Sequence, residues 1–235
     1  MIIEGAISVK AAIESKKRKI EKVYIRNDKS TKDLKYIERI CLRNNIPVIK
    51  EDKETIMNLS SSKSSGGIIA LADIRKIDEF DNGDIFFLDG IKDPFNLGYS
   101  MRTLYAFGFR NVLLNKRDYS LMEAQLLKSS AGAYDKLNIQ IAEDEISILN
   151  EYKNKGYHLY GLFRGDNSKD VFDCVFDDKS LFILGGEKRG ISREILSLCD
   201  EYLYISYGSD FRNALNACAA LDVVATLLYK QRKDK

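Results

Sequence analysis

The segment Asp93-Pro94-Phe95-Asn96-Leu97-Gly98 follows a short apolar run at residues 85–89 and leads into Met101-Arg102-Thr103-Leu104. This order predicts a strand, a loop stiffened by Pro94, and a helix over residues 96–107 that the Asn96 side chain can cap. Gly98 permits another backbone to come close. The segment therefore indicates a strand–turn–helix unit with polar side chains near the turn.

Strands and helices alternate from this unit to the C-terminus. Apolar runs at residues 111–114, 158–162, 181–185 and 202–205 are separated by helical patterns, and the last helix is expected over residues 213–229. Apolar strands between helices predict an α/β fold with a mostly parallel sheet and helices on both faces. Ligands of such sheets bind beyond the carboxyl ends of the strands.

A smaller α/β unit precedes this sheet. Its clearest element is a helix over residues 31–44, where apolar residues recur at helical spacing and Ser30 supplies a capping pattern. The polar stretch 73–84 is typical of a linker. We therefore expect two domains, residues 1–77 and residues 78–235.

Composition excludes several kinds of chemistry. The 235 residues include one histidine, His158, and four cysteines without a C-x-x-C pair, so neither a histidine-rich metal site nor a thiolate cluster can be assembled, and no metal is expected. Reduced thiols are the simplest account of the cysteines and favour a cytoplasmic location. The apolar runs are strand-sized, which predicts no membrane span.

Positive charge is concentrated at the N-terminus. Residues 1–50 hold 13 Lys and Arg against 6 Asp and Glu, a net charge of +7, whereas residues 51–235 carry −5. Such asymmetry is typical of a segment that meets RNA or DNA, although a lysine-rich solvated helix face explains it equally well.

Two glycine-containing clusters follow later strands. The first is Leu184-Gly185-Gly186-Glu187-Lys188-Arg189-Gly190, and the second is Ile205-Ser206-Tyr207-Gly208 followed by Asn213-Ala214-Leu215-Asn216. Neither the dinucleotide-binding G-x-G-x-x-G pattern nor the P-loop pattern is present. Glycines at such turns let a ligand contact backbone amides. Taken singly each cluster is weak, and Arg102 alone is more simply explained as an exposed surface charge.

In this order the clusters resemble the three motifs of the SpoU, or TrmH-like, RNA ribose 2′-O-methyltransferases of the SPOUT superfamily. The resemblance covers residues 84–230, and Ser130-Ala131-Gly132-Ala133 is similar to a further family segment. Residues 1–72 more weakly resemble the L30-like substrate-binding domain that precedes the catalytic domain in many members. The basic N-terminal charge then has a natural partner in RNA phosphates.

The resemblance implies a C-terminal trefoil knot, S-adenosylmethionine as cofactor and a homodimer. It assigns cofactor contacts to backbone groups of Gly185, Ile205 and Leu215. The catalytic residues that it implies are Arg102, Asn96, Glu187 and Asn216. Arg102 would act as a base or, equally consistent with its chemistry, as a group that orients a phosphate, because a guanidinium keeps its proton at neutral pH.

One departure from the family pattern concerns the site. Ala214-Leu215-Asn216 stands where members usually carry Ser-Leu-Asn, so a hydroxyl is missing. The sequence predicts a methyltransferase that acts on the 2′-hydroxyl of RNA, with ribosomal RNA as the expected substrate. The alternatives are a tRNA substrate, a catalytically weak RNA-binding homologue, or an α/β enzyme acting on a small metabolite.

Overall fold

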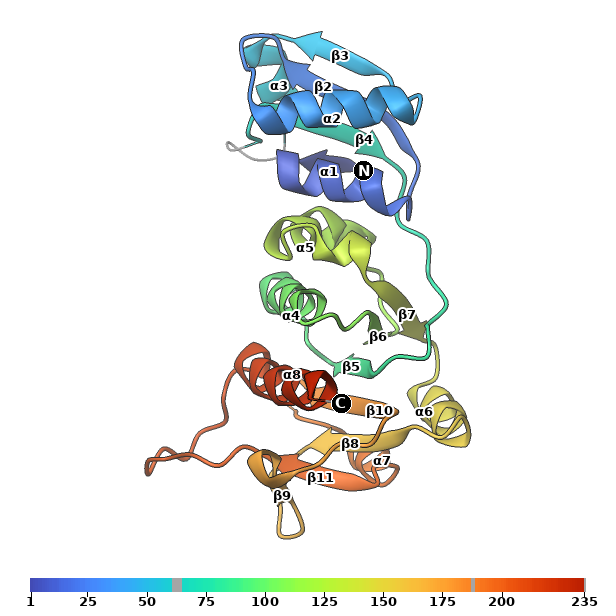
Figure 1. Cartoon of the computed structure of the whole chain (residues 1–235), viewed down its shortest axis with the longest axis vertical. Helices are drawn as coiled ribbons and strands as arrows, with labels where there is room; N and C mark the ends of the chain where they lie inside the picture. The colour runs from blue at the N-terminus through green and yellow to red at the C-terminus, as the bar shows by residue number, and fades with distance from the viewer. Residues whose placement is uncertain (61–64, 187–188, 235) are drawn as a thin grey trace. The chain divides into compact units, whose positions relative to one another are not determined.

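The structure, a computed structural model, describes residues 1–60, 65–186 and 189–234 and divides the chain into two compact units (Figure 1). The first unit combines residues 1–76 with residues 118–136. The second combines residues 77–117 with the described residues from 137 onward. The boundary expected from the sequence, after residue 77, assigns segment 118–136 to the second domain. In the structure this segment belongs to the first unit.

A four-stranded sheet in the order β1-β4-β2-β3 forms the centre of the first unit. The central strand β4 runs antiparallel to β1 and β2, and β2 runs parallel to β3. Its strands are β1 (Ile2–Glu4), β2 (Ile20–Arg26), β3 (Val48–Glu51) and β4 (Ile68–Ala72). Its helices are α1 (Ala6–Ser15), α2 (Lys32–Arg43), α3 (Lys53–Leu59), α5 (Glu123–Ser129) and the 3₁₀ helices η1 (Ser120–Met122) and η2 (Ala133–Lys136).

Helix α2 follows the pattern expected from the sequence. Its buried residues are Leu34, Ile37, Ile40 and Cys41, which recur at helical spacing. The predicted cap at Ser30 is wrong by one residue: Thr31 caps the helix, because its hydroxyl accepts a hydrogen bond from the Leu34 backbone N–H at 3.3 Å.

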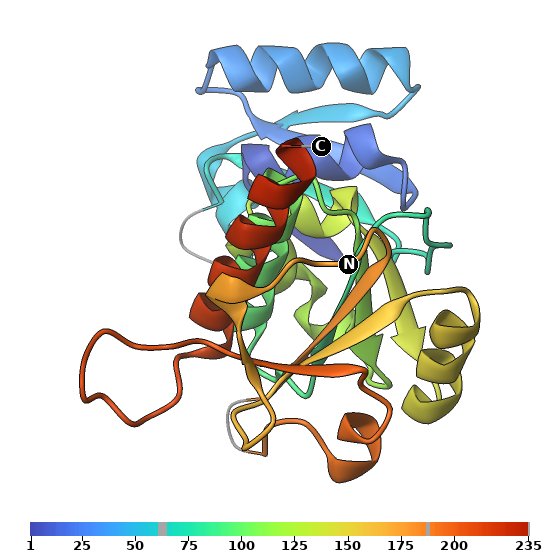
Figure 2. The same ribbon diagram turned by 60° about the horizontal axis from the view of Figure 1, so that its bottom comes forward.

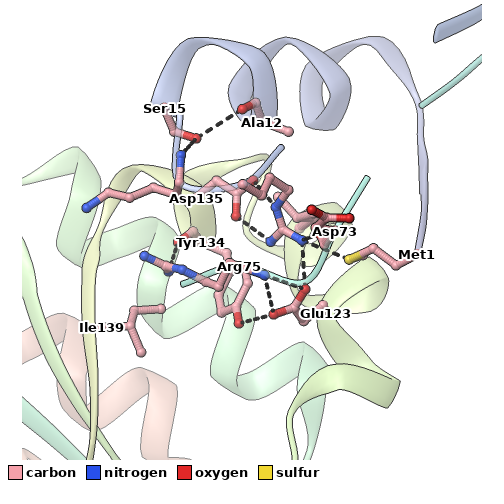
Figure 3. A network of polar contacts seen from close by, with 12 residues as sticks. Met1, Ala12, Ser15, Asp73, Arg75, Glu123, Tyr134, Asp135 and Ile139 are labelled. Carbon is pink, nitrogen blue, oxygen red and sulfur yellow. Dashed lines mark hydrogen bonds and ion pairs between the residues drawn. The ribbon is translucent and has the colours of Figure 1, made fainter. Parts of the chain in front are cut away.

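A buried ion cluster ties segment 118–136 to the rest of the first unit (Figure 3). The Arg18 guanidinium donates two hydrogen bonds to the Asp135 carboxylate, at 2.9 and 2.7 Å, and a third to Glu123 at 2.7 Å. Gly132 lies so close to α1 that a Cβ there would stand 2.5 Å from the Ala11 Cβ. Segment 118–136 is therefore held by ion pairs at Glu123 and Asp135 and by close packing at Gly132.

The second unit is a seven-stranded sheet in the order β7-β6-β5-β10-β8-β11-β9, and every neighbouring pair is parallel. This confirms the predicted parallel α/β sheet, whereas the trefoil knot stays a prediction. Its strands are β5 (Ile85–Asp89), β6 (Asn111–Asn115), β7 (Asn138–Ala142), β8 (His158–Leu162), β9 (Lys169–Asp170), β10 (Ser180–Gly185) and β11 (Glu201–Tyr204). Its helices are α4 (Pro94–Ala106), α6 (Glu145–Asn154), η3 (Val171–Asp173), α7 (Arg193–Leu196) and α8 (Ala217–Lys233).

Two helix starts differ from the sequence prediction. Asp93, not Asn96, caps α4, because its carboxylate accepts hydrogen bonds from the backbone N–H groups of Phe95 and Asn96 at 2.9 and 2.8 Å. Helix α8 begins at Ala217 rather than at residue 213, with Asn216 as its cap. Residues 213–216 therefore belong to the loop that precedes α8.

Aromatic packing and one ion pair hold α8 and the middle of the second sheet in place. Phe182 stacks between Phe86 and Tyr160, with ring centroids 5.2 and 5.1 Å away. Near the end of α8, Arg232 forms two hydrogen bonds with the Asp84 carboxylate, at 3.0 and 2.9 Å. No helix in the described part of the chain is long and apolar enough to cross a membrane.

Candidate functional site

A cavity of about 570 Å³ opens where parallel strands of the second unit reach their carboxyl ends. Strands β8, β10 and β11 all contribute residues to it, and the loop before α8 completes its wall. Its described lining residues are Leu162, Phe163, Arg164, Leu184, Gly185, Gly186, Gly190, Leu203, Tyr204, Ile205, Tyr207, Arg212, Asn213, Ala214, Leu215, Asn216, Ala217 and Ala220. This is the sheet edge at which α/β proteins bind ligands.

Two glycines of the cavity, Gly185 and Gly186, leave no room for side chains. A Cβ on Gly185 would collide with the Gly190 carbonyl carbon and stand 2.5 Å from the Ile191 backbone nitrogen. A Cβ on Gly186 would collide with the Gly90 carbonyl oxygen. This wall is consequently built from backbone, which suits a ligand bound through main-chain groups.

Residues 205–216 form a long loop between β11 and α8, and Figure 2 shows it projecting away from the sheet. The backbone N–H of Leu215 donates a hydrogen bond to the Tyr207 hydroxyl at 3.2 Å. This bond links the two ends of the loop, because Tyr207 lies two residues after Ile205. Both Ile205 and Leu215 line the cavity.

The structure brings four of the seven predicted site residues together. Gly185, Ile205, Leu215 and Asn216 line the same cavity although they lie far apart in sequence. The size of the cavity and its backbone-built wall fit a nucleoside cofactor, with Gly185, Ile205 and Leu215 as the residues that would hold it. Glu187 lies outside the described residues.

Asn96 and Arg102 do not line this cavity, yet α4 packs against α8, which carries Asn216 at its start. The Cys218 thiol donates to the backbone carbonyl of Asn96 at 2.9 Å. The Cys218 backbone N–H donates to the Asn216 side chain at 2.8 Å. Cys218 therefore connects the first turns of the two helices.

Arg102 lies on α4 with its side chain exposed. Within residues 1–60, 65–186 and 189–234 no hydrogen bond or ion pair engages its guanidinium. A cation on an exposed helix face is available to an anion from outside the chain.

A polar cluster fixes the turn between β5 and α4. The Asn115 side chain donates to Asp89 and to Glu145, both at 2.7 Å, and accepts from the Gly90 backbone N–H at 2.5 Å. Burial raises the pKa of Asp89, the hydrogen bond from Asn115 opposes that rise, and the nearby Glu145 adds to it. The cluster holds the strand end that precedes the motif-bearing loop.

Sequence reasoning missed Arg164 and Arg212 as residues of the cavity. Neither belongs to a glycine or capping pattern, so no local signal marks them. Tyr204 and Tyr207 also line the cavity. His158 lies on β8 outside the cavity, with Nδ1 3.2 Å from an Asp177 carboxylate oxygen.

No group of three or more His, Cys, Asp or Glu side chains is placed to hold a metal ion among the residues described. The cysteines that the structure describes are all free thiols. Burial raises the pKa of Cys199 to about 12, with the nearby Asp200 adding to the rise. That thiol is therefore protonated and unreactive at neutral pH.

Two protein-family models match the chain, one in each part. The model of the SpoU rRNA Methylase family matches residues 84–226, and the model for RNA 2′-O ribose methyltransferase substrate binding matches residues 2–77. A Staphylococcus haemolyticus protein named as a TrmH family tRNA/rRNA methyltransferase is 27% identical over 99% of this chain and 96% of its own length.

Solved structures show the same fold. An RNA 2′-O ribose methyltransferase superposes with a TM-score of 0.81 at 19% identity, covering 99% of this chain and 89% of the other. The SpoU methyltransferase AviRb from Streptomyces viridochromogenes, solved in complex with AdoMet, superposes with a TM-score of 0.80 at 18% identity, covering 100% and 91%.

Proposed function

The chain belongs to the SpoU rRNA methylase family, and from this membership we propose that it transfers a methyl group to a ribose 2′-hydroxyl of RNA, with ribosomal RNA as its substrate. The observation that carries the proposal is the cavity at the carboxyl ends of β8, β10 and β11. It gathers Gly185, Ile205, Leu215 and Asn216, four of the residues that the family resemblance assigns to the site.

S-adenosylmethionine, when bound, supplies a methyl group on a sulfonium, and its transfer leaves a neutral thioether that needs no metal for stabilisation. Backbone groups of Gly185, Ile205 and Leu215 hold the cofactor in this proposal. Asn216, whose side chain lies at the start of α8 on the cavity wall, orients the ribose. Alignment of the hydroxyl with the methyl group is then the main contribution of the protein.

Arg102 acts on the RNA in this proposal by orienting a phosphate, while the ribose hydroxyl loses its proton to solvent late in the reaction; action as a base would require the guanidinium to give up its own proton first. The exposed guanidinium, which has no partner among the described residues, suits the phosphate-orienting role. Asn96 and Glu187 shape its surroundings. Because Arg102 and Asn96 do not line the cavity of their own chain, we propose that a second copy of the chain completes the site.

Methyl transfer to ribosomal RNA transcribed in vitro, measured with S-adenosylmethionine labelled on its methyl group, tests the proposal. Wild-type protein is expected to label the RNA, and Arg102→Ala to abolish labelling while the RNA is still bound. Arg193→Ala, which changes an exposed arginine on α7 outside the cavity, is the matched control. Mass spectrometry of the digested RNA must place the label on a ribose; label on a base would refute the 2′-hydroxyl assignment.

The same assay with tRNA transcripts separates the two substrate classes. Labelling of tRNA but not of ribosomal RNA would replace our substrate assignment. Binding of RNA without labelling of either substrate would favour the alternative of a catalytically weak RNA-binding homologue. That alternative is suggested by Ala214, which lines the cavity where family members carry a hydroxyl.

A further inference from the structure

Two arginines give the cavity a positive wall. Arg164 follows β8 and Arg212 lies in the loop before α8, and both side chains are exposed. They are the charged members of the described lining, in which no carboxylate occurs. No carboxylate among the described lining residues therefore neutralises their charges.

The Arg164 guanidinium rests on an aromatic platform. Its central carbon lies 5.8 Å from the centroid of the Tyr204 ring and 5.5 Å from that of Tyr207. Cation–π contacts of this length steady a guanidinium without using its N–H donors. In the part of the chain that the structure describes, neither arginine has a hydrogen-bond or ion-pair partner.

A held guanidinium whose donors have no partner among the described residues is suited to an anion with paired oxygens, either a phosphate or a carboxylate. The proposed cofactor carries a carboxylate, but its ammonium and sulfonium leave it a net cation, which two arginines would repel. A polyanion balances both charges. Exposure of both side chains also places them on the solvent side of the cavity, where RNA would arrive.

We propose that Arg164, on its Tyr204 and Tyr207 platform, and Arg212 are positioning residues that bind backbone phosphates of the RNA beside the ribose to be methylated. The inference rests on the proposed function and adds the contacts that place the substrate. It assigns the two arginines to RNA and not to the cofactor.

The test uses the full-length protein with Arg164→Gln and Arg212→Gln, and Arg193→Gln as the control arginine. Filter binding to unmodified ribosomal RNA is measured over a series of salt concentrations. Each cavity variant is expected to weaken binding about 3- to 10-fold and to reduce the slope of log affinity against log salt by about 0.7 to 0.9, the effect of losing one phosphate contact. Arg193→Gln should leave both values unchanged.

Calorimetry with S-adenosylhomocysteine separates the two possible anions. Unchanged affinity in Arg164→Gln and Arg212→Gln supports the phosphate assignment, whereas a loss of affinity with an unaltered salt slope would show that the arginines hold the cofactor carboxylate and would overturn it. Arg164→Lys keeps the positive charge but loses the planar pair of N–H donors. Its salt slope should therefore lie closer to the wild-type value than its KM for RNA does.

Failure of the proposed function has a different signature. If wild-type protein labels no RNA but binds it with an arginine-dependent salt slope, the methyl-transfer proposal fails and the phosphate contacts stand. If wild-type protein labels RNA and the variants match it in KM and salt slope, only the present inference fails.

Discussion

The Tyr207 hydroxyl accepts a hydrogen bond from the backbone N–H of Leu215 and thereby closes the loop that carries two of the expected cofactor contacts. Tyr207→Phe removes this acceptor and keeps the ring. A neutral hydrogen bond contributes about 1 kcal/mol, so we expect the affinity for S-adenosylhomocysteine to fall about fivefold. Tyr204→Phe is the control, because the Tyr204 hydroxyl has no hydrogen-bond partner among the described residues. Equal affinities of the two variants would show that the loop does not depend on this bond.

Gly185→Ala should strongly weaken cofactor binding. The added methyl group would overlap the Gly190 backbone, so the turn after β10 has to move. We expect the affinity for S-adenosylhomocysteine to fall more than tenfold and the melting temperature to drop by several degrees. Gly208→Ala, where an added Cβ meets no atom within 4 Å, should change neither. Normal affinity of Gly185→Ala for S-adenosylhomocysteine would show that the backbone at Gly185 does not contribute to the cofactor site.

Ala214→Ser should raise turnover severalfold. The substitution places a hydroxyl on the cavity wall beside Leu215 and Asn216. Members of the family usually carry serine at this position. Ala220→Ser places a hydroxyl on the same cavity from within α8 and should have no such effect. The two variants are compared by initial rates of RNA labelling; a rate unchanged in Ala214→Ser would mean that the serine is dispensable in this chain.

Asp84→Asn should destabilise the second unit by about 2 kcal/mol. The buried Asp84 carboxylate accepts two hydrogen bonds from Arg232 and one, at 3.1 Å, from the Ser180 backbone N–H, and the variant loses the charge that makes them strong. Urea unfolding measures the free energy of unfolding. Glu143→Gln breaks an exposed pair with Lys116 and should cost less than about 0.5 kcal/mol. A similar small loss in both would contradict the anchoring role of Asp84.

Arg18→Met should cost about 3–5 kcal/mol of stability in the first unit. Burial disfavours the charged form of Arg18, but its hydrogen bonds and ion pairs with Asp135 and Glu123 outweigh this and raise its pKa. Removal of the guanidinium leaves two buried carboxylates without their Arg18 ion pairs. Circular dichroism during urea unfolding checks the loss. Arg26→Met, which breaks a pair with the half-exposed Asp28, should have a much smaller effect; equal losses would count against the buried cluster.

The sequence patterns predicted the elements whose signals are local. Apolar runs of strand length became β5, β6, β8 and β10, because a strand buried on both faces needs continuous apolar residues. The start of α8 was predicted too early, because the Ala and Leu between residues 213 and 217 favour helix, whereas the chain there forms the cavity wall.

Contacts between distant residues had no such signal. Arg18 meets Glu123 and Asp135 at separations of 105 and 117 residues, and nothing near Arg18 indicates a buried ion pair. The strands β1 and β7 were missed for local reasons: β1 has only three residues, and in β7 the polar Asn138 and Gln140 interrupt the apolar run. Arg164 likewise became a candidate only once the fold placed it beside Tyr204 and Tyr207.

The Arg18 cluster also determines which fragments of this protein contain a complete first unit. A fragment ending near residue 77 would keep the guanidinium and lose both carboxylates, because these belong to residues 118–136. Such a fragment would expose the site of an unpaired cation and the face of α1 that Gly132 covers. Isolated expression of the N-terminal segment would thus yield an incomplete domain, and a faithful version would need residues 118–136 joined to it through a designed linker.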